Sequence, residues 1–287
     1  MSLLKTPTYL VCPPTHYEVA YVINPWMRPE EWAAHRTTWQ AKAEAQWQGL
    51  ITAMTKLGWG IEEIPGAQGL PDMVFAANHA FVLDGVALVS HFATPERAPE
   101  EPLAASWFQA HGFDVRQTQT IQEGGGDILF DPSIGERGMI FVGGGEENIL
   151  PFRSAPDTVD EVAALYHRET IQLPLRNPYF YHLDTCFCPL LNGWAMYAPA
   201  AFGDTAIARM KKIYGDKLIA VEAQDADHFA CNAVVHGNDI VMPRVGDKLT
   251  GQLHDLGFTT HQLELDAFIL AGGASRCLTL KLTDRTA

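Results

Sequence analysis

Apolar and polar positions along this chain follow a recurring order: an apolar hairpin, an amphipathic helix and a further strand. The clearest helical period lies over 28–58, where large or apolar side chains recur every three to four residues, at Trp32, His35, Trp39, Ala43 and Trp47. The same pattern predicts further helices over 99–112, 157–167, 202–215 and 245–257. Asp157 and Asp204 are suitable N-caps for two of them, and several end at glycine.

Strand pairs with turn chemistry separate these helices. Tight hairpin turns are predicted at Asp84-Gly85, Asn192-Gly193 and Gly237-Asn238, and a hairpin with a longer loop over 127–143. The apolar run 277–282 is expected to pair with the stretch YLVCPP near the N-terminus.

The order of these elements favours a repeat architecture. Five helices separated by hairpins suggest five similar α/β modules with a period of roughly 45–70 residues. A mixed α/β domain without rotational symmetry stays open, because the modules share too little sequence to decide. No linker divides the chain, so a single domain over 1–287 is expected.

Composition and charge narrow the function classes. Hydrophobic residues make up 47% of the 287 residues and charged residues 19%, a balance typical of a globular protein. The formal net charge of −14 disfavours nucleic acid and anionic membranes as partners, because both need basic patches, and it suits a cationic small molecule. A solubilising acidic surface is the commoner reason for such a charge. No stretch reaches the roughly 20 apolar residues of a membrane span, and the start lacks a secretory signal, so a cytoplasmic location is expected.

The five cysteines form neither a disulfide framework nor a zinc pattern. They are odd in number and widely spread. Cys12 and Cys231 lie in apolar, strand-like runs and are interpreted as small buried side chains. Cys186 and Cys188 form C-x-C and not the C-x-x-C of zinc sites, so neither a metal nor a cofactor is expected. Cys277 is different, because two glycines and an arginine lead into it in the stretch GGASRCLTLKL.

Polar side chains interrupt the apolar pattern in four stretches, each at the entrance or in the middle of a predicted strand. They are PDMVFAANHAFV with Asp72 and Asn78, IQEGGGDILF with Glu123 and Asp127, YFYHLDTCFCPLL with His182 and Asp184, and the stretch with Cys277. Each has a structural alternative: the three glycines fit a tight turn or a phosphate nest, His182 a satisfied core histidine, and Asp184 a local cap. Together they supply a thiol, an imidazole and several carboxylates, a set suited to nucleophilic chemistry.

These stretches resemble the guanidino-group modifying enzymes, the superfamily of arginine deiminase, dimethylarginine dimethylaminohydrolase, glycine amidinotransferase and succinylarginine dihydrolase. The similar segments, among them YHLDTCFCPL and the glycine-led terminal cysteine, follow the family's order and span nearly the whole chain. The opening CPPTHYEVAYVINPWM further resembles the arginine dihydrolase branch. The resemblance implies a pentein fold, a five-bladed α/β propeller of ββαβ modules with pseudo-fivefold symmetry and a central active site, which agrees with the five predicted helices.

The resemblance also implies roles for the interrupting side chains. Cys277 would be the nucleophile, and the reaction would pass through a covalent amidino-thioether on its sulfur. His182 would protonate the leaving ammonia and then activate water. Glu123 would hold the guanidinium and orient His182, although the third glycine leaves open whether Glu123 or Asp127 is the catalytic carboxylate. Asp184 is expected as the second carboxylate that binds the guanidinium.

The substrate implied is a small cationic guanidino compound, arginine or a derivative, whose two ends need partners. Arg97 and Arg153 match family arginines that clamp the substrate carboxylate. Asp72 is expected either to bracket the amino end or to hold its loop, and Asn24 to contact the substrate or a lid. Arg276 is expected to help lower the pKa of the neighbouring thiol.

The reaction implied is hydrolysis of arginine to ornithine, carbon dioxide and ammonia. The alternatives are a deiminase or dimethylargininase that stops at citrulline, an amidinotransferase, and a catalytically silent binding protein on the same fold. The combination of Cys277, His182 and Glu123 disfavours the binding protein. The sequence is compatible with a homo-oligomer and does not determine the oligomeric state.

Asn78 is the residue that distinguishes ornithine from citrulline as the product. Six residues after Asp72, deiminases and dimethylargininases resemble one another in having aspartate, whereas this chain has asparagine, as the dihydrolases do. A neutral amide holds a ureido group about as well as a guanidinium, whereas a second anion favours the cation and releases neutral citrulline.

Replacing this amide tests the interpretation. Asn78→Asp should make citrulline the end product from arginine, because the new carboxylate no longer retains the neutral intermediate. Chromatographic quantification of both amino acids measures the change, and undiminished ornithine would contradict the assignment.

Overall fold

Small three-stranded sheets are the building units of this structure, a computed structural model that describes residues 6–145 and 153–282. In these two ranges fifteen strands form five sheets. The sheets are β3 (Ala80–Leu83), β4 (Val86–Val89) and β5 (Asp114–Gln117); β6 (Ile128–Asp131), β7 (Met139–Val142) and β8 (Glu169–Gln172); β9 (Phe187–Pro189), β10 (Ala195–Tyr197) and β11 (Leu218–Ala220); β12 (Val234–His236), β13 (Asp239–Pro243) and β14 (Thr259–Leu263); and β15 (Leu280–Lys281), β1 (Thr8–Val11) and β2 (Gly60–Glu63).

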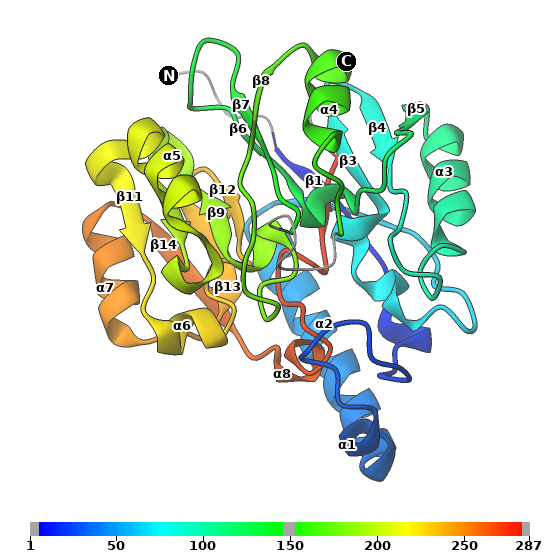
Figure 1. The fold of residues 1–287 in the computed structure, drawn as a ribbon. Helices are drawn as coiled ribbons and strands as arrows, with labels where there is room; N and C mark the ends of the chain where they lie inside the picture. The colour runs from blue at the N-terminus through cyan, green and yellow to red at the C-terminus, as the bar shows by residue number, and fades with distance from the viewer. Residues whose placement is uncertain (1–5, 146–152, 283–287) are drawn as a thin grey trace.

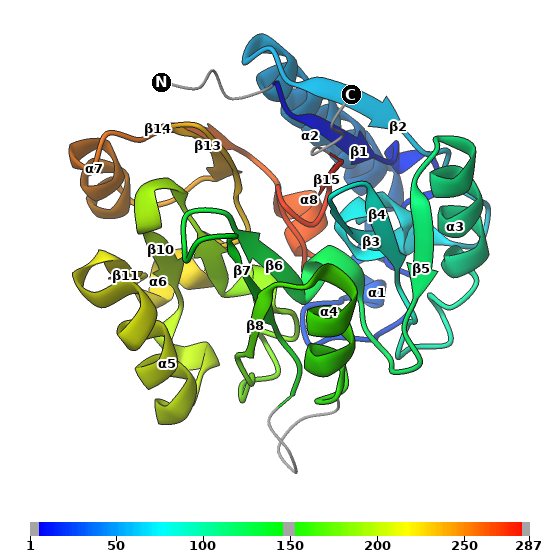
Figure 2. The same cartoon turned by 90° about the horizontal axis from the view of Figure 1, so that it is seen from above.

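The five sheets share one topology. The middle strand of each pairs antiparallel with one neighbour and parallel with the other. A helix connects the two parallel strands, as such a crossover requires. These helices are α2 (Arg36–Lys56), α3 (Glu100–Ala110), α4 (Thr158–Tyr166), α5 (Asp204–Tyr214) and α7 (Asp247–Asp255). The sheets lie around a common centre with the helices outside (Figures 1 and 2), so the chain is a mixed α/β fold.

Four of the five helix predictions are confirmed to within two residues at each end. The prediction of one helix over 28–58 is wrong, because the backbone breaks at His35 (φ −133°, ψ 30°) and leaves α1 (Pro29–Ala34) separate from α2. Gly203, and not Asp204, is the N-cap of α5. The short helices α6 (Ala223–Asp227) and α8 (Asp266–Ile269) were not predicted.

The predicted turns have the backbone that their residues favour. Asp84 and Asn192 have positive φ (51° and 61°), as does the glycine after each. Leu83 pairs with Val86, so Asp84-Gly85 is a two-residue hairpin turn, whereas the second turn is longer, because Leu190 bonds Trp194 across it. The end of the apolar run 277–282 pairs antiparallel with β1, with Leu280 opposite Leu10, so the predicted closure is confirmed. The expected domain ends at residues 1 and 287 lie outside the described residues.

The interrupting polar side chains precede their strands, and the prediction that some lie inside strands is wrong. Asp72 and Asn78 lie in the 3-10 helices Pro71–Val74 and Ala76–His79, and β3 begins only at Ala80. Asp184 likewise lies in the 3-10 helix Leu183–Thr185, before β9. Tight turns suit these residues because they leave backbone N–H and C=O groups for the polar side chains to pair with.

Apolar packing between neighbouring sheets keeps the centre rigid. Phe141 of β7 packs edge-on against Phe187 of β9 with ring centroids 5.0 Å apart, and both rings contact Tyr214 of α5. All five cysteines are buried and unpaired. None of the helices in the described ranges combines the length and apolar character that crossing a membrane requires.

Gly124 begins the turn that separates Glu123 from Asp127, and it should not tolerate a side chain. Its φ is +54°, and a Cβ would lie 2.8 Å from the backbone of Ala80. Gly124→Ala should lower the free energy of unfolding by about 2–4 kcal/mol, from backbone strain and overpacking.

The matched control is Gly251→Ala in α7, where a Cβ meets nothing within 4 Å. This change should stabilise the protein by roughly 0.5–1 kcal/mol, because alanine favours the helix. Urea unfolding midpoints measure both variants, and equal effects would refute the explanation.

Candidate active site

Five turns meet at the centre of the molecule, one shortly before each of β3, β6, β9, β12 and β15, the strands that pair antiparallel with the middle strand of each sheet. We call them the central turns; they are residues 76–79, 123–127, 182–186, 228–232 and 274–279. The predicted site residues Asn78, Glu123, Asp127, His182, Asp184 and Cys277 all lie in them.

Hydrogen bonds join each central turn to the next. The Cys277 backbone N–H donates to Asn232 Oδ1 (3.1 Å), and the Ala77 N–H donates to the Cys277 carbonyl (3.1 Å). Asn78 Nδ2 then donates to the Glu123 carbonyl (3.1 Å).

Two further bonds complete the circuit. The Leu183 N–H donates to Asp127 Oδ1 (3.0 Å), and Asn232 Nδ2 donates to the Asp184 carbonyl (3.2 Å). The five sheets therefore fix the relative positions of the site residues through backbone groups.

Cys277 lies at the bottom of a small cavity and is 2% exposed. Its thiol faces Asp184 Oδ2 at 3.3 Å, and its sulfur accepts from Asn232 Nδ2 at 3.0 Å. Burial, and next the Asp184 carboxylate, raise the pKa of Cys277 well above its usual value. The resting cysteine is therefore a thiol, and a cation placed beside Asp184 would favour the thiolate.

His182 shares this cavity and is held by Glu123. Its Nε2 lies 2.7 Å from Glu123 Oε2, and its Nδ1 has no partner among the described residues. The Tyr181 ring packs against the imidazole with centroids 4.6 Å apart. One ring nitrogen is thus fixed by a carboxylate, and the other remains for proton transfer.

Glu123 and Asp127 differ in partners and ionisation. Burial alone would raise the pKa of Glu123, but Arg153 and the bond to His182 hold it below its usual value. Burial raises the pKa of Asp127, which accepts from Ser154 Oγ and the Leu183 N–H. Glu123 is therefore the ionised carboxylate beside the imidazole. Asp127 holds the turn that carries His182 through its bond to the Leu183 N–H.

Asp184 and Asp72 each keep one buried oxygen without a partner in the described part of the chain. Burial raises the pKa of Asp184 to about 6, opposed by the charges of His182 and Arg276. Asp72 lines the cavity and accepts from the Tyr21 hydroxyl at 3.0 Å. Two carboxylate oxygens are thus available to a cation.

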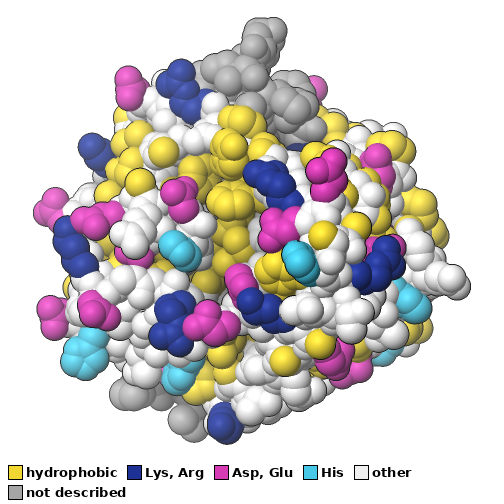
Figure 3. Space-filling model, turned by 90° about the horizontal axis from the view of Figure 1, so that it is seen from below, with side chains coloured by type: hydrophobic (Ala, Val, Ile, Leu, Met, Phe, Trp, Pro, Cys, Tyr) yellow, Lys and Arg dark blue, Asp and Glu magenta, His cyan; other side chains and the backbone are white. Residues whose placement is uncertain are grey.

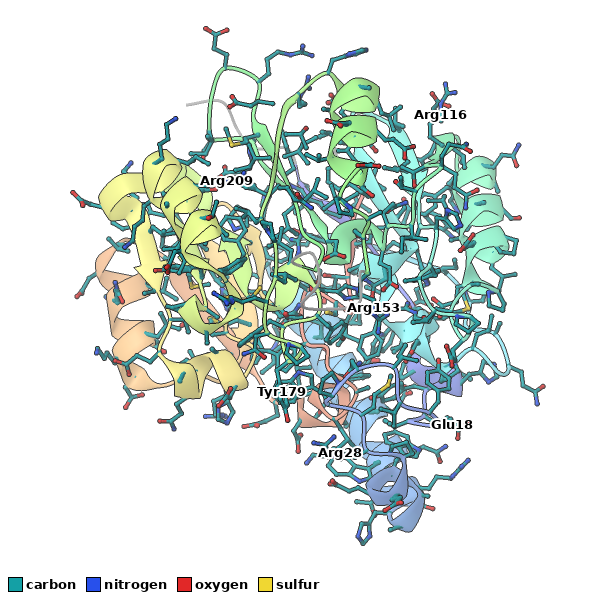
Figure 4. All side chains as sticks on the ribbon, viewed as in Figure 1. Glu18, Arg28, Arg116, Arg153, Tyr179 and Arg209 are labelled. Carbon is teal, nitrogen blue, oxygen red and sulfur yellow. The ribbon has the colours of Figure 1, made fainter. Side chains whose placement is uncertain are left out.

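The two arginines that were predicted to bind the substrate carboxylate, Arg97 and Arg153, are hydrogen-bonded to other side chains of the protein. Arg153 Nη1 lies 3.1 Å from both Glu123 oxygens, and Figure 4 shows it near the middle of the molecule, away from the peripheral Arg116. Arg97 pairs with Glu100 and with Asn78. Neither arginine is a solvated surface residue, because both are less than 10% exposed.

The remaining predicted residues lie at the rim or behind the site. Asn24 lines the cavity, with Nδ2 donating to the Ala271 carbonyl and Oδ1 accepting from the Trp26 N–H. The charge of Arg276 opposes the rise in the pKa of Asp184 that burial causes.

On the face seen from below, apolar side chains gather near the centre and charges of both signs surround them (Figure 3).

No protein-family model matches the chain. It is 40% identical over 279 residues to ArgZ of Synechocystis sp., a bifunctional arginine dihydrolase/ornithine cyclodeaminase. The aligned residues make up 96% of this chain and 37% of the relative. It is 34% identical over 278 residues to the N(G),N(G)-dimethylarginine dimethylaminohydrolase of Mycobacterium tuberculosis, which covers 97% of this chain and 86% of the relative. The chain belongs to the guanidino-group modifying family, near the arginine dihydrolases.

A solved structure of this family extends the comparison. The N-terminal domain of ArgZ, bound to product, matches with a TM-score of 0.88 and 36% identity over 98% of each chain. The chain spans less than two fifths of the bifunctional relatives, 37% and 38% of their lengths.

Two residues of this site, Asn232 and Tyr181, were not predicted from the sequence. Asn232 is fully buried, and its side chain accepts from the N–H groups of Ala274 and Cys277. The available signal was an amide at the start of the run NAVVHGNDIVMP, directly after the buried Cys231. Within residues 6–145 and 153–282, no cluster of three or more His, Cys, Asp or Glu side chains is arranged to hold a metal.

The raised pKa of Cys277 predicts slow alkylation. Asp184→Asn removes the adjacent anion, lowers the pKa of the thiol and should speed labelling of Cys277 by iodoacetamide at pH 8 by about tenfold, one pKa unit or about 1.4 kcal/mol. Mass spectrometry of the peptide that contains residue 277 gives the rate.

The control is Asp131→Asn, a buried carboxylate that bonds Ser133 and Tyr214 and not the thiol. Its labelling rate should equal that of the parent. An unchanged rate in Asp184→Asn would show that Asp184 does not restrain the thiol.

Proposed function

We propose that this protein is an arginine dihydrolase, which converts arginine and two waters into ornithine, carbon dioxide and two ammonia. The observation that carries the proposal is that Cys277 and His182 line one small cavity. Asp184 is bonded to the thiol and Glu123 to the imidazole. The relationship to ArgZ, whose name states this reaction, supports the choice of arginine.

Binding of the guanidinium would activate the nucleophile. Above pH 6, Asp184 is mostly ionised and presents one buried oxygen to the cation. The cation offsets the two influences that raise the pKa of Cys277, burial and the Asp184 charge, and so favours the thiolate. Its sulfur attacks the guanidino carbon to give the amidino-thioether, and His182 donates a proton to the departing ammonia.

Water then releases the sulfur. His182 takes a proton from the attacking water, the carbon–sulfur bond breaks, and a ureido compound, citrulline, remains in the site. A second attack by Cys277 on the ureido carbon expels the second ammonia, and a second water leaves a carbamate, which loses carbon dioxide to give ornithine. Asn78 is the residue that we assign to retaining the neutral intermediate.

The substrate's other end would engage the rim. Arg153 is the proposed partner of its carboxylate, Asp72 of its amino group, and Asn24 of the nearby backbone. The sequence-based assignment of Arg97 to the carboxylate is not kept in this proposal, because Glu100, Asn78 and the Asp72 carbonyl already hold its guanidinium. Because Arg153 is bonded to both oxygens of Glu123, a guanidinium that uses Glu123 has to replace this ion pair. Asp127 and Arg276 are proposed to support the site from behind.

We also propose that the five sheets form a pentein propeller with pseudo-fivefold symmetry and that residues 1–287 are a single domain. The repeated strand topology and the sheets' placement around one centre support this (Figure 2). A cytoplasmic location remains a prediction from the sequence.

One alternative has specific support. The Mycobacterium tuberculosis relative is named as a dimethylarginine dimethylaminohydrolase, an activity that stops at citrulline. Asn78 disfavours it, because the amide lacks the charge that would release a neutral product.

Product stoichiometry decides between these functions. Incubation with arginine, with ornithine, citrulline and ammonia measured together, should give two ammonia per ornithine and little citrulline. One ammonia per citrulline, or turnover of dimethylarginine alone, would overturn the proposal. Cys277→Ser should reduce turnover at least about 10³-fold, whereas Cys12→Ser, outside the cavity, should retain it.

A further inference from the structure

A buried ion pair lies directly behind Asn78. Arg97 Nε donates to Glu100 Oε1 (3.0 Å) and Nη2 donates to Glu100 Oε2 (2.8 Å), and Glu100 is fully buried at the start of α3. The Arg97 guanidinium also lies over the Phe92 ring, 4.6 Å from its centroid. Both carboxylate oxygens are therefore used to fix one orientation of the guanidinium.

Arg97 donates further hydrogen bonds to the two turns that carry Asp72 and Asn78. Nη2 also donates to the Asp72 carbonyl (3.1 Å), and Nη1 donates to Asn78 Oδ1 (2.8 Å). The contacts among residues 6–145 and 153–282 thus use four of its five N–H groups. An arginine whose N–H groups are used in this way is held in one position in the wall of the cavity.

The guanidinium dictates which way the Asn78 amide points. Arginine can only donate, so the oxygen of the amide has to face Arg97 and its nitrogen the other way. The nitrogen donates one N–H to the Glu123 carbonyl (3.1 Å). It lies beside Gly126, where a Cβ would come within 2.3 Å of Nδ2 and 3.1 Å of His182 Nδ1. The amide nitrogen and the imidazole therefore border the same space beside Gly126.

This polarity matters for a neutral intermediate. A ureido oxygen accepts hydrogen bonds, so an N–H that faces it holds citrulline in the site, whereas an amide oxygen in the same place would repel it. The neighbouring His79 does not hold the Asn78 amide: it is fully buried, neither ring nitrogen makes a hydrogen bond among the described residues, and its Nε2 lies 3.8 Å from Glu100 Oε2.

We propose that Glu100 is a positioning residue that sets the product of the reaction: by fixing Arg97 it keeps the Asn78 N–H turned toward the citrulline intermediate. The inference rests on the proposed dihydrolase function and adds a residue that does not line the cavity. Glu100 acts on the second hydrolysis, and it leaves the attack on the cationic guanidinium largely unaffected.

The test is Glu100→Gln, which keeps the size of the side chain and removes the second charged acceptor. Arg97 is then held less firmly, and the Asn78 amide keeps the Glu123 carbonyl as its remaining strong restraint. The ratio of citrulline to ornithine released from arginine should rise about tenfold, while arginine consumption falls less than threefold. A general loss of folded protein would reduce both products in proportion, so the ratio reports positioning alone.

Glu101→Gln is the matched control on the same helix. Its carboxylate accepts from the Phe92 N–H and from Gln117 and does not touch Arg97. Its product ratio should equal that of the parent. In an Asn78→Ala background, Glu100→Gln should change the ratio little further, because both changes remove the same restraint.

The outcomes separate the two proposals. If the parent releases no ornithine, the dihydrolase function fails and this inference fails with it. If the parent releases ornithine and Glu100→Gln leaves the ratio unchanged, only the inference is overturned. Should Glu100→Gln not fold, Glu100→Asp takes its place, since the shorter carboxylate cannot reach both N–H groups of Arg97; a parental ratio then overturns the inference equally.

Discussion

A closed circuit of hydrogen bonds between the five central turns is the constraint on which the site depends. Each turn shortly precedes the strand that pairs antiparallel with the middle strand of its sheet, and each donates to or accepts from the next turn around the centre. Backbone groups carry part of every link, so the positions of the reactive side chains follow from the packing of the sheets. Asn232 contributes twice, to the turn of Cys277 and to that of Asp184.

Two buried carboxyl groups beside the cavity, Glu123 and Asp184, have pKa values shifted in opposite directions. Glu123 is paired with a guanidinium and an imidazole, so the pKa of its carboxyl lies below the usual range. Asp184 faces a thiol, and burial raises the pKa of its carboxyl to about 6. One carboxylate therefore orients the imidazole, and the other favours the protonated thiol. In the proposed reaction a guanidinium substrate would supply the positive charge that favours the thiolate.

Two buried ion pairs, Arg153–Glu123 and Arg97–Glu100, surround the cavity in the described part of the chain. Such pairs add little net stability, because desolvation offsets their attraction. Their presence is better explained by orientation: each fixes a group that lines the cavity, His182 in one case and Asn78 in the other. On this view the choice between relatives that stop at citrulline and those that continue depends on residues behind the cavity as well as on those that line it.

Local sequence was enough to place four of the five predicted helices, the turns at Asp84 and Asn192, and the stretches that carry Cys277, His182 and Glu123, because periodicity and turn chemistry act over a few residues. It did not show that the helix over 28–58 breaks at His35, that the polar residues precede their strands, or that Asn232 holds Cys277 from 45 residues away. The pairing of Arg97 with both Glu100 and Asn78 was equally hidden. Those contacts exist only once the five sheets close around a centre, since side-chain partners distant in the chain are selected by packing and by the need to satisfy every buried polar group.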